Sequence, residues 1–384
     1  MTQLQTARTL QDATTQERDP RAAATELRSK LGDAKNALIA LFVSHDRDLP
    51  PLAKALSDEF ADTQIVGCTT AGEVTPMGYA NGSVTAVAFR ADTFDASITE
   101  IPDLEDFELT SGQALATSAI ESFQEQFGTE PDFSLFLIDG LSVREELVLA
   151  ALEPLVSKVP LLGGSAGDGT NFGRTHILID GEFRTDTAAV ALLSCRRPFH
   201  VFKTQHFVGT TERLVVTGAE SSKRIVSEIN GLVAGEEYAR AVGLEGAELT
   251  PLVFAAHPVV MKIGGLYYVR SIQRVDEQGR LHFFCAIEEG SVLTVARGVD
   301  MVDDLDRALN DVEAKLGEVE AVLTFDCILR RLESDRKALG PRLQSLFERF
   351  NIVGFSTYGE QFHRMHVNQT FTGLAIGGLD ENDG

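Results

Sequence analysis

The amino-acid sequence predicts an α/β (α+β) fold of internally repeated strand-helix-strand-turn-strand units, with mixed sheets covered by helices. The main observation is that this order of elements recurs three times along the chain. A length of 384 residues exceeds that of one ordinary domain. The content of 43% hydrophobic and 24% charged residues is typical of a soluble globular protein.

Each copy begins with an apolar run of the length of a buried strand, continues through a helical stretch and reaches a turn rich in glycine and hydroxyl residues. The apolar runs are Ala37–His45, Phe133–Gly140 and Ala321–Cys327. The turns are IVGCTTAGE (65–73), LLGGSAGDG (161–169) and IVGFSTYGE (352–360). Strand-like segments then close the copies at Ser83–Arg90, Thr187–Ser194 and Asn368–Gly378. In the second copy, Ser142 and Glu145 have the spacing of a capping box.

The region between the second and third copies has a different pattern. From Leu214 it predicts a strand, two helices and then successive strands beginning with LVFAAHPVVM (252–261), with a hairpin turn at Asp276–Gly279. The helix Val302–Gly317 follows, with one apolar face. We therefore expect a flexible tail over 1–32, one domain over 33–205, a second over 206–379 and a short tail over 380–384.

Charge and cysteine usage exclude several classes of function. The chain has 34 basic and 57 acidic residues, a formal net charge of −23, which repels nucleic acids and anionic membranes. The N-terminus is polar, unlike a secretory signal, and no apolar stretch is long enough to span a membrane. The four cysteines are far apart, which favours the reducing cytoplasm over a disulfide framework.

Several separated motifs resemble the FIST domains. IVGCTTAGE and LLGGSAGDG resemble the N-terminal FIST domain, and INGLVAGEEY, FDCILRR, VGFSTYGE and NQT resemble the C-terminal one. The resemblance covers residues 36–378 and implies a cytoplasmic sensory protein that binds a small ligand and signals to a histidine kinase, cyclase or chemotaxis receptor. Some stand-alone bacterial members bind haem and sense nitric oxide. With no effector domain before Gly384, this chain resembles that type and is expected to act in trans.

Two interpretations of the repeated turn remain open, one structural and one functional. Gly67, Gly163 and Gly354 permit close approach of backbones while the hydroxyls bond locally; alternatively, the turns line a ligand pocket. The candidate ligand contacts are Cys68, Thr69, Thr70, Glu73, Ser165, Asp168, Ser356, Thr357 and Glu360. A phosphate loop is disfavoured, because no lysine and helix follow any copy.

The spacing G-x-S-x-G around Ser165 leaves a serine hydrolase as the alternative function. The sequence after this serine is strand-like and turn-rich, whereas a nucleophile elbow leads into a helix. We therefore expect no catalytic residues.

The third strand ends at two further candidate ligand contacts, Cys327 and Arg330, where Arg330 could hold a carboxylate in a bidentate pair. A buried cysteine and a surface arginine are the structural alternative. Asn368, from the NQT motif, completes the candidate set.

Haem is an open alternative that needs an axial histidine in an apolar cleft. His366 lies just before NQT, but Val367 separates it from the asparagine that directly follows a histidine in the family pattern. His257 is the other candidate. We expect a non-enzymatic sensor whose ligand is either haem with nitric oxide or a small metabolite such as an amino acid.

Overall fold

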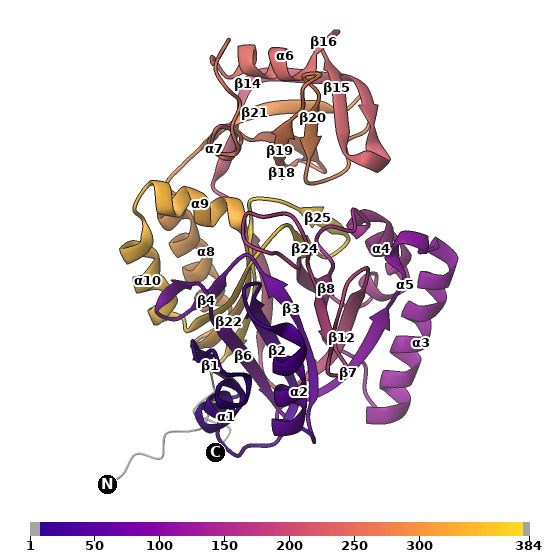
Figure 1. Ribbon diagram of the computed structural model, residues 1–384, viewed down its shortest axis with the longest axis vertical. Helices are drawn as coiled ribbons and strands as arrows, with labels where there is room; N and C mark the ends of the chain where they lie inside the picture. Colours follow the sequence, from indigo (N-terminus) through magenta and orange to yellow (C-terminus); the bar gives the residue numbers. More distant parts are fainter. Residues whose placement is uncertain (1–7, 379–384) are drawn as a thin grey trace.

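Three similar units surround a common centre, and a separate layer lies above them (Figure 1). This computed structural model describes residues 8–378. The strands form mixed sheets and the helices lie outside them, which confirms the predicted fold class. No helix in that part of the chain has the length and apolar character needed to cross a membrane.

Each unit has the order strand, helix, strand, helix, strand, hairpin, strand. The first contains β1 (Leu10–Thr15), α1 (Pro20–Leu31), β2 (Asn36–Ser44), α2 (Leu49–Glu59), β3 (Gln64–Thr70), β4 (Glu73–Thr75), β5 (Gly78–Ala80) and β6 (Val84–Arg90). The second contains β7 (Phe94–Ile101), η1 (Leu104–Asp106), α3 (Leu109–Phe127), β8 (Phe133–Ile138), α4 (Glu145–Ala151), α5 (Glu153–Val156), β9 (Leu161–Ser165), β10 (Ile177–Ile179), β11 (Glu182–Arg184) and β12 (Ala188–Cys195). The third contains β13 (Phe199–Thr204), α8 (Met301–Leu316), β22 (Val319–Cys327), α9 (Ile328–Arg336), α10 (Gly340–Arg349), β23 (Ile352–Thr357), β24 (Glu360–Phe362), β25 (Met365–Val367) and β26 (Phe371–Gly377).

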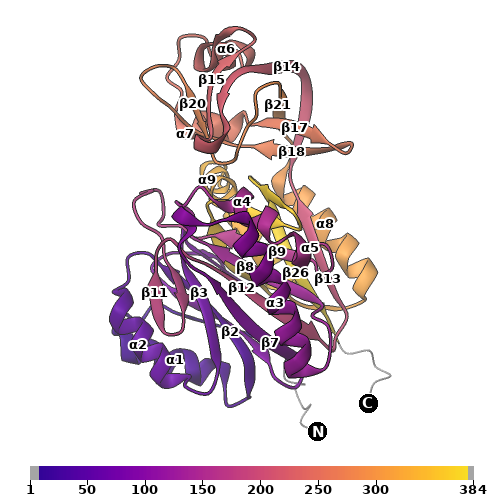
Figure 2. The same ribbon diagram turned by 90° about the vertical axis from the view of Figure 1, so that its right-hand side faces the viewer.

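The units exchange their hairpins. In each sheet, a parallel pair (β2–β3, β8–β9 or β22–β23) is flanked on one side by the last and first strands of its own unit. On the other side, β10–β11 of the second unit joins the first sheet, β24–β25 of the third joins the second, and β4–β5 of the first joins the third. Figure 2 shows β11 reaching to the side of β3 and α2. The three units are therefore interlocked.

The glycine of each turn motif has a common structural reason. A Cβ at Gly67, Gly163 or Gly354 would lie 2.2, 1.8 or 1.8 Å from a carbonyl oxygen of the neighbouring parallel strand. No side chain fits at that distance, so these positions require glycine whatever the turns bind.

Apolar side chains from all three sheets fill the centre. Leu38, Leu135 and Leu323 are examples of these buried inner residues. Three further clusters, one for each of these three sheets, lie between the sheet and its own helices. Both faces of the three sheets are therefore buried.

The upper layer is an insertion in the third unit, spanning residues 207–298. It contains β14 (Phe207–Glu220), η2 (Ser221–Lys223), β15 (Ile225–Ile229), β16 (Leu232–Val233), α6 (Ala234–Ala241), α7 (Pro251–Ala256), β17 (Val259–Ile263), β18 (Leu266–Arg270), β19 (Ile272–Val275), β20 (Leu281–Phe283) and β21 (Val292–Gly298). The chain enters and leaves it through adjacent linkers, where the amide of Val299 donates to the carbonyl of His206 at 2.8 Å. The layer has its own core.

Some expected elements differ from the structure. Residues 10–31, assigned to a flexible tail, form β1 and α1; β1 pairs with β6 as an edge strand, which its short, polar sequence does not reveal. The expected tails at 1–7 and 380–384 lie outside the described residues. The segment 251–256 is α7 and not a strand, because Pro251 begins a helical turn. The expected boundary at 205/206 falls where the chain passes into the layer.

The turn at Asp276–Gly279 and the helix α8 are confirmed, with Leu305, Leu309 and Val312 buried. The expected capping box is wrong: α4 begins at Glu145, whose carboxylate bonds elsewhere, and Ser142 donates to the carbonyl of Asp139 at 2.7 Å.

We predict that Gly163→Ala lowers the free energy of unfolding by about 1–3 kcal/mol, the usual effect of overpacking a well-packed interior. Gly340→Ala is the matched control, because nothing lies within 4 Å of its added Cβ and the residue begins α10, where alanine is neutral or favourable. Urea unfolding of both variants measures the difference. Equal stabilities would show that the close approach at Gly163 is not a constraint.

Candidate functional site

The three repeated turns meet at one point. These turns, Thr70–Glu73, Ser165–Asp168 and Thr357–Glu360, follow the ends of β3, β9 and β23. The amide of Gly167 donates to the carbonyl of Thr69 at 2.9 Å, and that of Ser165 donates to the carbonyl of Gly359 at 2.8 Å. The amide of Ala71 donates to the carbonyl of Ser356 at 2.9 Å, which closes the ring of contacts. The carboxyl ends of the parallel strands therefore converge beneath the upper layer.

In the first and third turns, the hydroxyls and carboxylates bond to one another. Thr70 donates to Glu73 at 2.5 Å, and Thr357 donates to Glu360 at the same sequence spacing. Ser83 and Thr370, ten residues after each glutamate, supply a second hydroxyl and a backbone amide. All these side chains are buried, so they contribute to the interior and not to an open pocket.

The other predicted turn residues are also inaccessible. Cys68 lies in the central core and Cys327 beneath the layer, where burial raises the pKa of both thiols well above its ordinary value. Thr69 accepts the amide of His176 at 3.0 Å. Ser356 is fully buried.

Asp168 has a different role, because it fixes a loop. Its Oδ2 accepts the amides of Gly173 and Arg174, each at 2.8 Å, and its Oδ1 accepts the hydroxyl of Tyr358. The loop thereby places the Phe172 ring against that of Tyr358, with centroids 4.6 Å apart and planes 26° apart. Phe172 has a φ of 51°, a costly value for a bulky residue.

Ser165 is not arranged as a nucleophile. It has no exposed surface, its hydroxyl donates to Glu145 Oε1 at 3.0 Å, and it accepts Gln361 Nε2 at 3.0 Å. Gln361 stands between this serine and His366. Within residues 8–378, no imidazole contacts the hydroxyl as a serine–histidine pair requires.

Glu145 belongs to a buried ionic cluster that joins the body to the layer. Arg224 Nη2, from the layer, lies 2.5 Å from Oε2 of Glu145 and 2.5 Å from Oε2 of Glu146, both in α4. The amide of Ala286, also in the layer, donates to Glu146 at 2.8 Å. Burial alone would raise the pKa of Glu146, but the charges of His366 and Arg224 lower it to about 2. Glu146 therefore stays ionised against Arg224.

Arg224 keeps donors that this cluster does not use. The residue is 7% exposed, and its buried Nε has no hydrogen-bond partner within residues 8–378. Its φ of 56° is again unusual for a residue other than glycine. An unpartnered buried donor is costly, so it needs an explanation.

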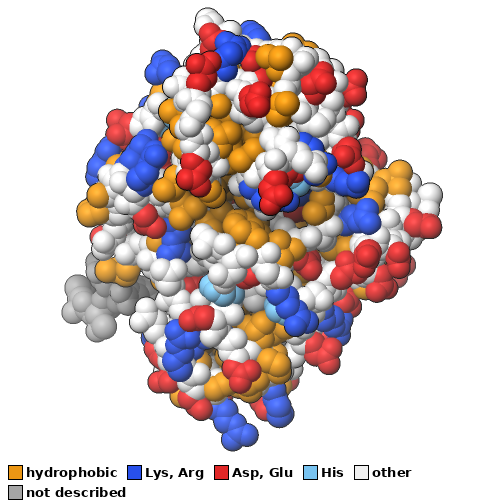
Figure 3. Space-filling view, turned by 45° about the horizontal axis from the view of Figure 1, so that its top comes forward, with side chains coloured by type: hydrophobic (Ala, Val, Ile, Leu, Met, Phe, Trp, Pro, Cys, Tyr) orange, Lys and Arg blue, Asp and Glu red, His pale blue; other side chains and the backbone are white. Residues whose placement is uncertain are grey.

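Beside Arg224 lies a cavity of about 190 Å³, which we call the seam cavity because it lies between body and layer. From the body it is lined by Gly140, Leu141, Val143, Phe172 and Tyr358. From the layer it is lined by Lys223, Arg224, Gln273, His282, Phe283 and Phe284. Figure 3 looks towards the layer and shows apolar side chains gathered where it meets the body.

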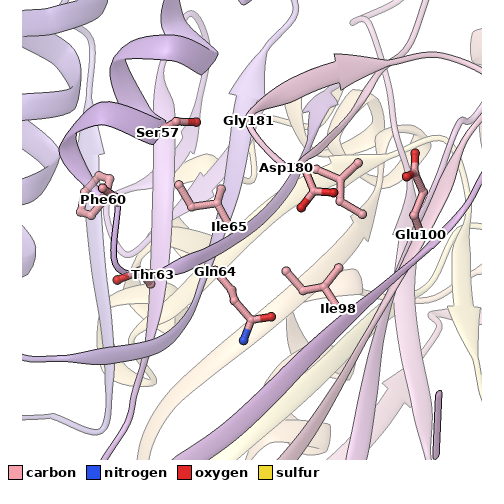
Figure 4. A pocket seen from close by; sticks show the side chains of 11 residues that line it. Ser57, Phe60, Thr63, Gln64, Ile65, Ile98, Glu100, Asp180 and Gly181 are labelled. Atoms are coloured by element: carbon pink, nitrogen blue, oxygen red, sulfur yellow. The ribbon is translucent and has the colours of Figure 1, made fainter. Parts of the chain in front are cut away.

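A larger hollow of about 330 Å³, the side groove, lies away from the turns. Figure 4 shows Ile65 and Ile98 within it, with Phe60 to one side and Asp180 and Glu100 to the other. Glu100 is already paired with Arg184, at 2.6 Å. Despite its greater volume, the side groove has no unpartnered buried charge, so the seam cavity is the better candidate site.

Arg330 is bound within the protein. Its Nε donates to Asp326 at 2.7 Å, and its Nη1 lies 3.0 Å from Nδ1 of His206, whose Nε2 contacts Glu333 at 2.9 Å. The guanidinium is fully buried and braces the linker to the layer. It does not line either hollow, unlike the ligand contact that the sequence suggested.

His366, the first candidate haem ligand, is also engaged. His366 Nε2 lies 3.0 Å from the carbonyl of Phe284, and Nδ1 lies 3.2 Å from Gln361 Nε2. His257 is half-buried after α7, and neither histidine lines the seam cavity or the side groove. A haem iron needs a free imidazole nitrogen in an apolar cleft, so these residues do not fit a haem site in this geometry. Asn368 also lies where the body meets the layer, and its side-chain oxygen accepts the amide of Ser271 at 3.4 Å.

The sequence predicted none of the eleven residues that line the seam cavity. Tyr358 had a visible signal, because it stands where the other turns have Ala71 and Gly167. Consecutive aromatics at Phe283–Phe284 were a weaker one. Arg224 had none, since it follows a polar stretch and its role depends on distant glutamates.

We predict that stability falls between pH 5 and 8 because of Glu360. Burial raises its pKa from 4.5 to about 8, so the folded state retains a proton that the unfolded state has lost over that range. Linkage then lowers the free energy of unfolding as the pH rises, by up to about 3 kcal/mol. Glu360→Gln should flatten this slope in urea unfolding, and the control Glu348→Gln, on the exposed face of α10, should not. A slope unchanged in Glu360→Gln would contradict the assignment.

Comparisons with known proteins give the family. The FIST N domain model matches residues 37–232 and the FIST C domain model matches residues 234–363. No curated protein matches. Among the solved structures, one described as the crystal structure of a chorismatase at 1.08 Å resolution covers 96% of this chain and 99% of that chain, at 10% identity and a TM-score of 0.39. A TM-score that low supports no statement about function. FIST domains are associated with signal transduction and the sensing of small ligands, and this chain belongs to the FIST family.

Proposed function

We propose that this protein is a non-enzymatic sensor that binds a small molecule in the seam cavity and regulates a signalling partner such as a histidine kinase or cyclase. The observation that carries the proposal is the composition of the cavity wall. Five residues come from the body and six from the layer, and one of the six is Arg224, whose Nη1 has no hydrogen bond within residues 8–378. A ligand there would contact both parts at once.

Such a ligand would act on a contact held largely by polar groups. Besides the Arg224 cluster, Ser271 donates to Gln369 at 3.0 Å, and Gln369 donates to the carbonyl of Ala255 at 3.0 Å. Buried polar contacts have strict geometry and are weakened by small displacements. A ligand that binds one position of the layer better than others shifts its population by that difference in affinity.

The layer is also the better surface for a partner. It has nine basic and eleven acidic residues, a net charge of −2, which leaves −21 on the rest of the chain. Several of its large apolar side chains are exposed: Val208, Val215, Leu232, Val233, Leu252, Ile263 and Val292. A near-neutral apolar surface suits protein contacts better than a strongly acidic one.

The candidate ligand classes are not equally supported. Haem would require an apolar cleft to open beside His366 or His257, and His366 would also have to lose its present contacts. A small metabolite needs only the existing cavity. A haem protein would reveal itself by a Soret band that survives gel filtration and weakens in His366→Ala or His257→Ala.

We predict that a small-molecule ligand stabilises the protein through the seam cavity. In a thermal-shift screen of amino acids and small organic acids, at least one compound should raise the Tm, since binding to the native state adds stability by mass action. Gln273→Trp, which fills the cavity, should abolish the shift, whereas the control Thr63→Trp in the side groove should not. A shift lost only in Thr63→Trp would place the ligand elsewhere. No shift with any compound would count against the proposal.

The non-enzymatic part of the proposal has its own test. The wild type and Ser165→Ala should show the same background rate on a broad panel of esters, because the buried hydroxyl has no base. Hydrolysis by the wild type that falls at least a hundredfold in Ser165→Ala would establish the hydrolase alternative instead.

A further inference from the structure

The residues around the seam cavity define a chemical class of ligand. The argument rests on the proposed function, since it concerns the same cavity. Its lining includes Lys223 and Arg224 but no aspartate or glutamate, although the chain has 57 acidic residues. Glu145 and Glu146 contact Arg224 but do not line the cavity, so the lining itself presents cations to an anion and no carboxylate to an ammonium group.

Arg224 can bind an anion without giving up its role in the fold. Both glutamates contact only Nη2, at 2.5 Å each. Its Nε has no partner, and Nη1 has no hydrogen bond within the described residues. Nε has almost no accessible surface, so a carboxylate in the cavity would accept from Nη1, the donor that is neither bonded nor closed off. Lys223, whose ammonium is held only by the exposed Glu220 at 2.7 Å, adds a second cation.

The opposite wall is aromatic. Phe172 stacks on Tyr358, and its centroid is 6.0 Å from that of Phe284, so rings from body and layer meet at the cavity. Phe172 is 36% exposed and lies in a loop that Asp168 holds in place. An exposed phenylalanine on a strained backbone suggests a contact that a ligand would complete.

The volume limits the size of the ligand. A dry cavity of about 150 Å³ accepts benzene, so about 190 Å³ accepts one ring with a short acidic group. We propose that the seam cavity binds a small aromatic carboxylate, its ring against Phe172 and Phe284 and its carboxylate on Arg224 and Lys223. Zwitterionic amino acids should bind more weakly, since their ammonium would lie against a wall without a carboxylate.

Three probes that share a phenyl ring test this assignment: phenylacetate, phenylalanine and phenethylamine, titrated calorimetrically into the full chain. Phenylacetate should bind at least tenfold more tightly than the other two, about the effect of one charge-assisted hydrogen bond. Two variants at exposed positions follow: Lys223→Gln should weaken phenylacetate binding about threefold, and Phe172→Leu about tenfold. The matched control Lys262→Gln, an exposed lysine in the same layer, should leave the Kd unchanged. Arg224→Lys, which keeps the charge but loses the Nη1 donor, should weaken it further.

The inference is overturned if phenylalanine or phenethylamine binds as tightly as phenylacetate, or if neither Lys223→Gln nor Phe172→Leu changes the Kd of phenylacetate. It is also overturned if phenylacetate fails to bind while another compound gives a thermal shift that Gln273→Trp abolishes. In that last case the sensor proposal stands and only the ligand class is wrong. If no compound gives such a shift, both proposals fail.

Discussion

The ring of backbone contacts among the three turns is the constraint on which the rest of the structure depends. Each sheet can place its parallel strands only where the glycine of one strand meets the carbonyl of the next, and each turn can end only where another turn supplies a partner for its amide. Because these groups are buried, an unmade bond would cost about 1–3 kcal/mol. Small residues, hydroxyls and carboxylates at the turns are thus explained by the interior, and the proposed ligand site lies one layer further out.

The layer rests on this ring through charged and polar groups that are expensive to bury. The pairing of Arg224 with Glu145 and Glu146 offsets part of that cost, but a hydrophobic contact of the same size would often be as stable. The ionic contact adds a geometric requirement, because its hydrogen bonds form in one position of the layer and are broken in others. A part that must respond to a weakly stabilising ligand is better held in this way than by a large apolar interface.

The sequence was sufficient to predict the repeated order of elements, because a buried parallel strand is a continuous apolar run and the helix after it has a recognisable start. It was insufficient for the hairpin exchange, since a strand as short as Glu73–Thr75 contains nothing that identifies its partner Gly354–Phe355 in another unit. For the site, residues such as Glu73 and Glu360 were visible but turned inward to neighbouring hydroxyls. Arg224 became significant only when folding placed it beside α4, 79 residues from Glu145.

Hairpin exchange also bears on how such a chain could arise. Three identical chains, each donating a hairpin to the next around a threefold axis, would build the same set of sheets as a closed ring. The body therefore has the topology of a swapped trimer whose protomers have been joined end to end. Joining them removes the requirement for symmetry: one copy can accept 92 residues between its first strand and first helix while the other two stay uninterrupted. A symmetric trimer would have to place three such layers over a single axis, so only the fused chain can leave one side open to a ligand.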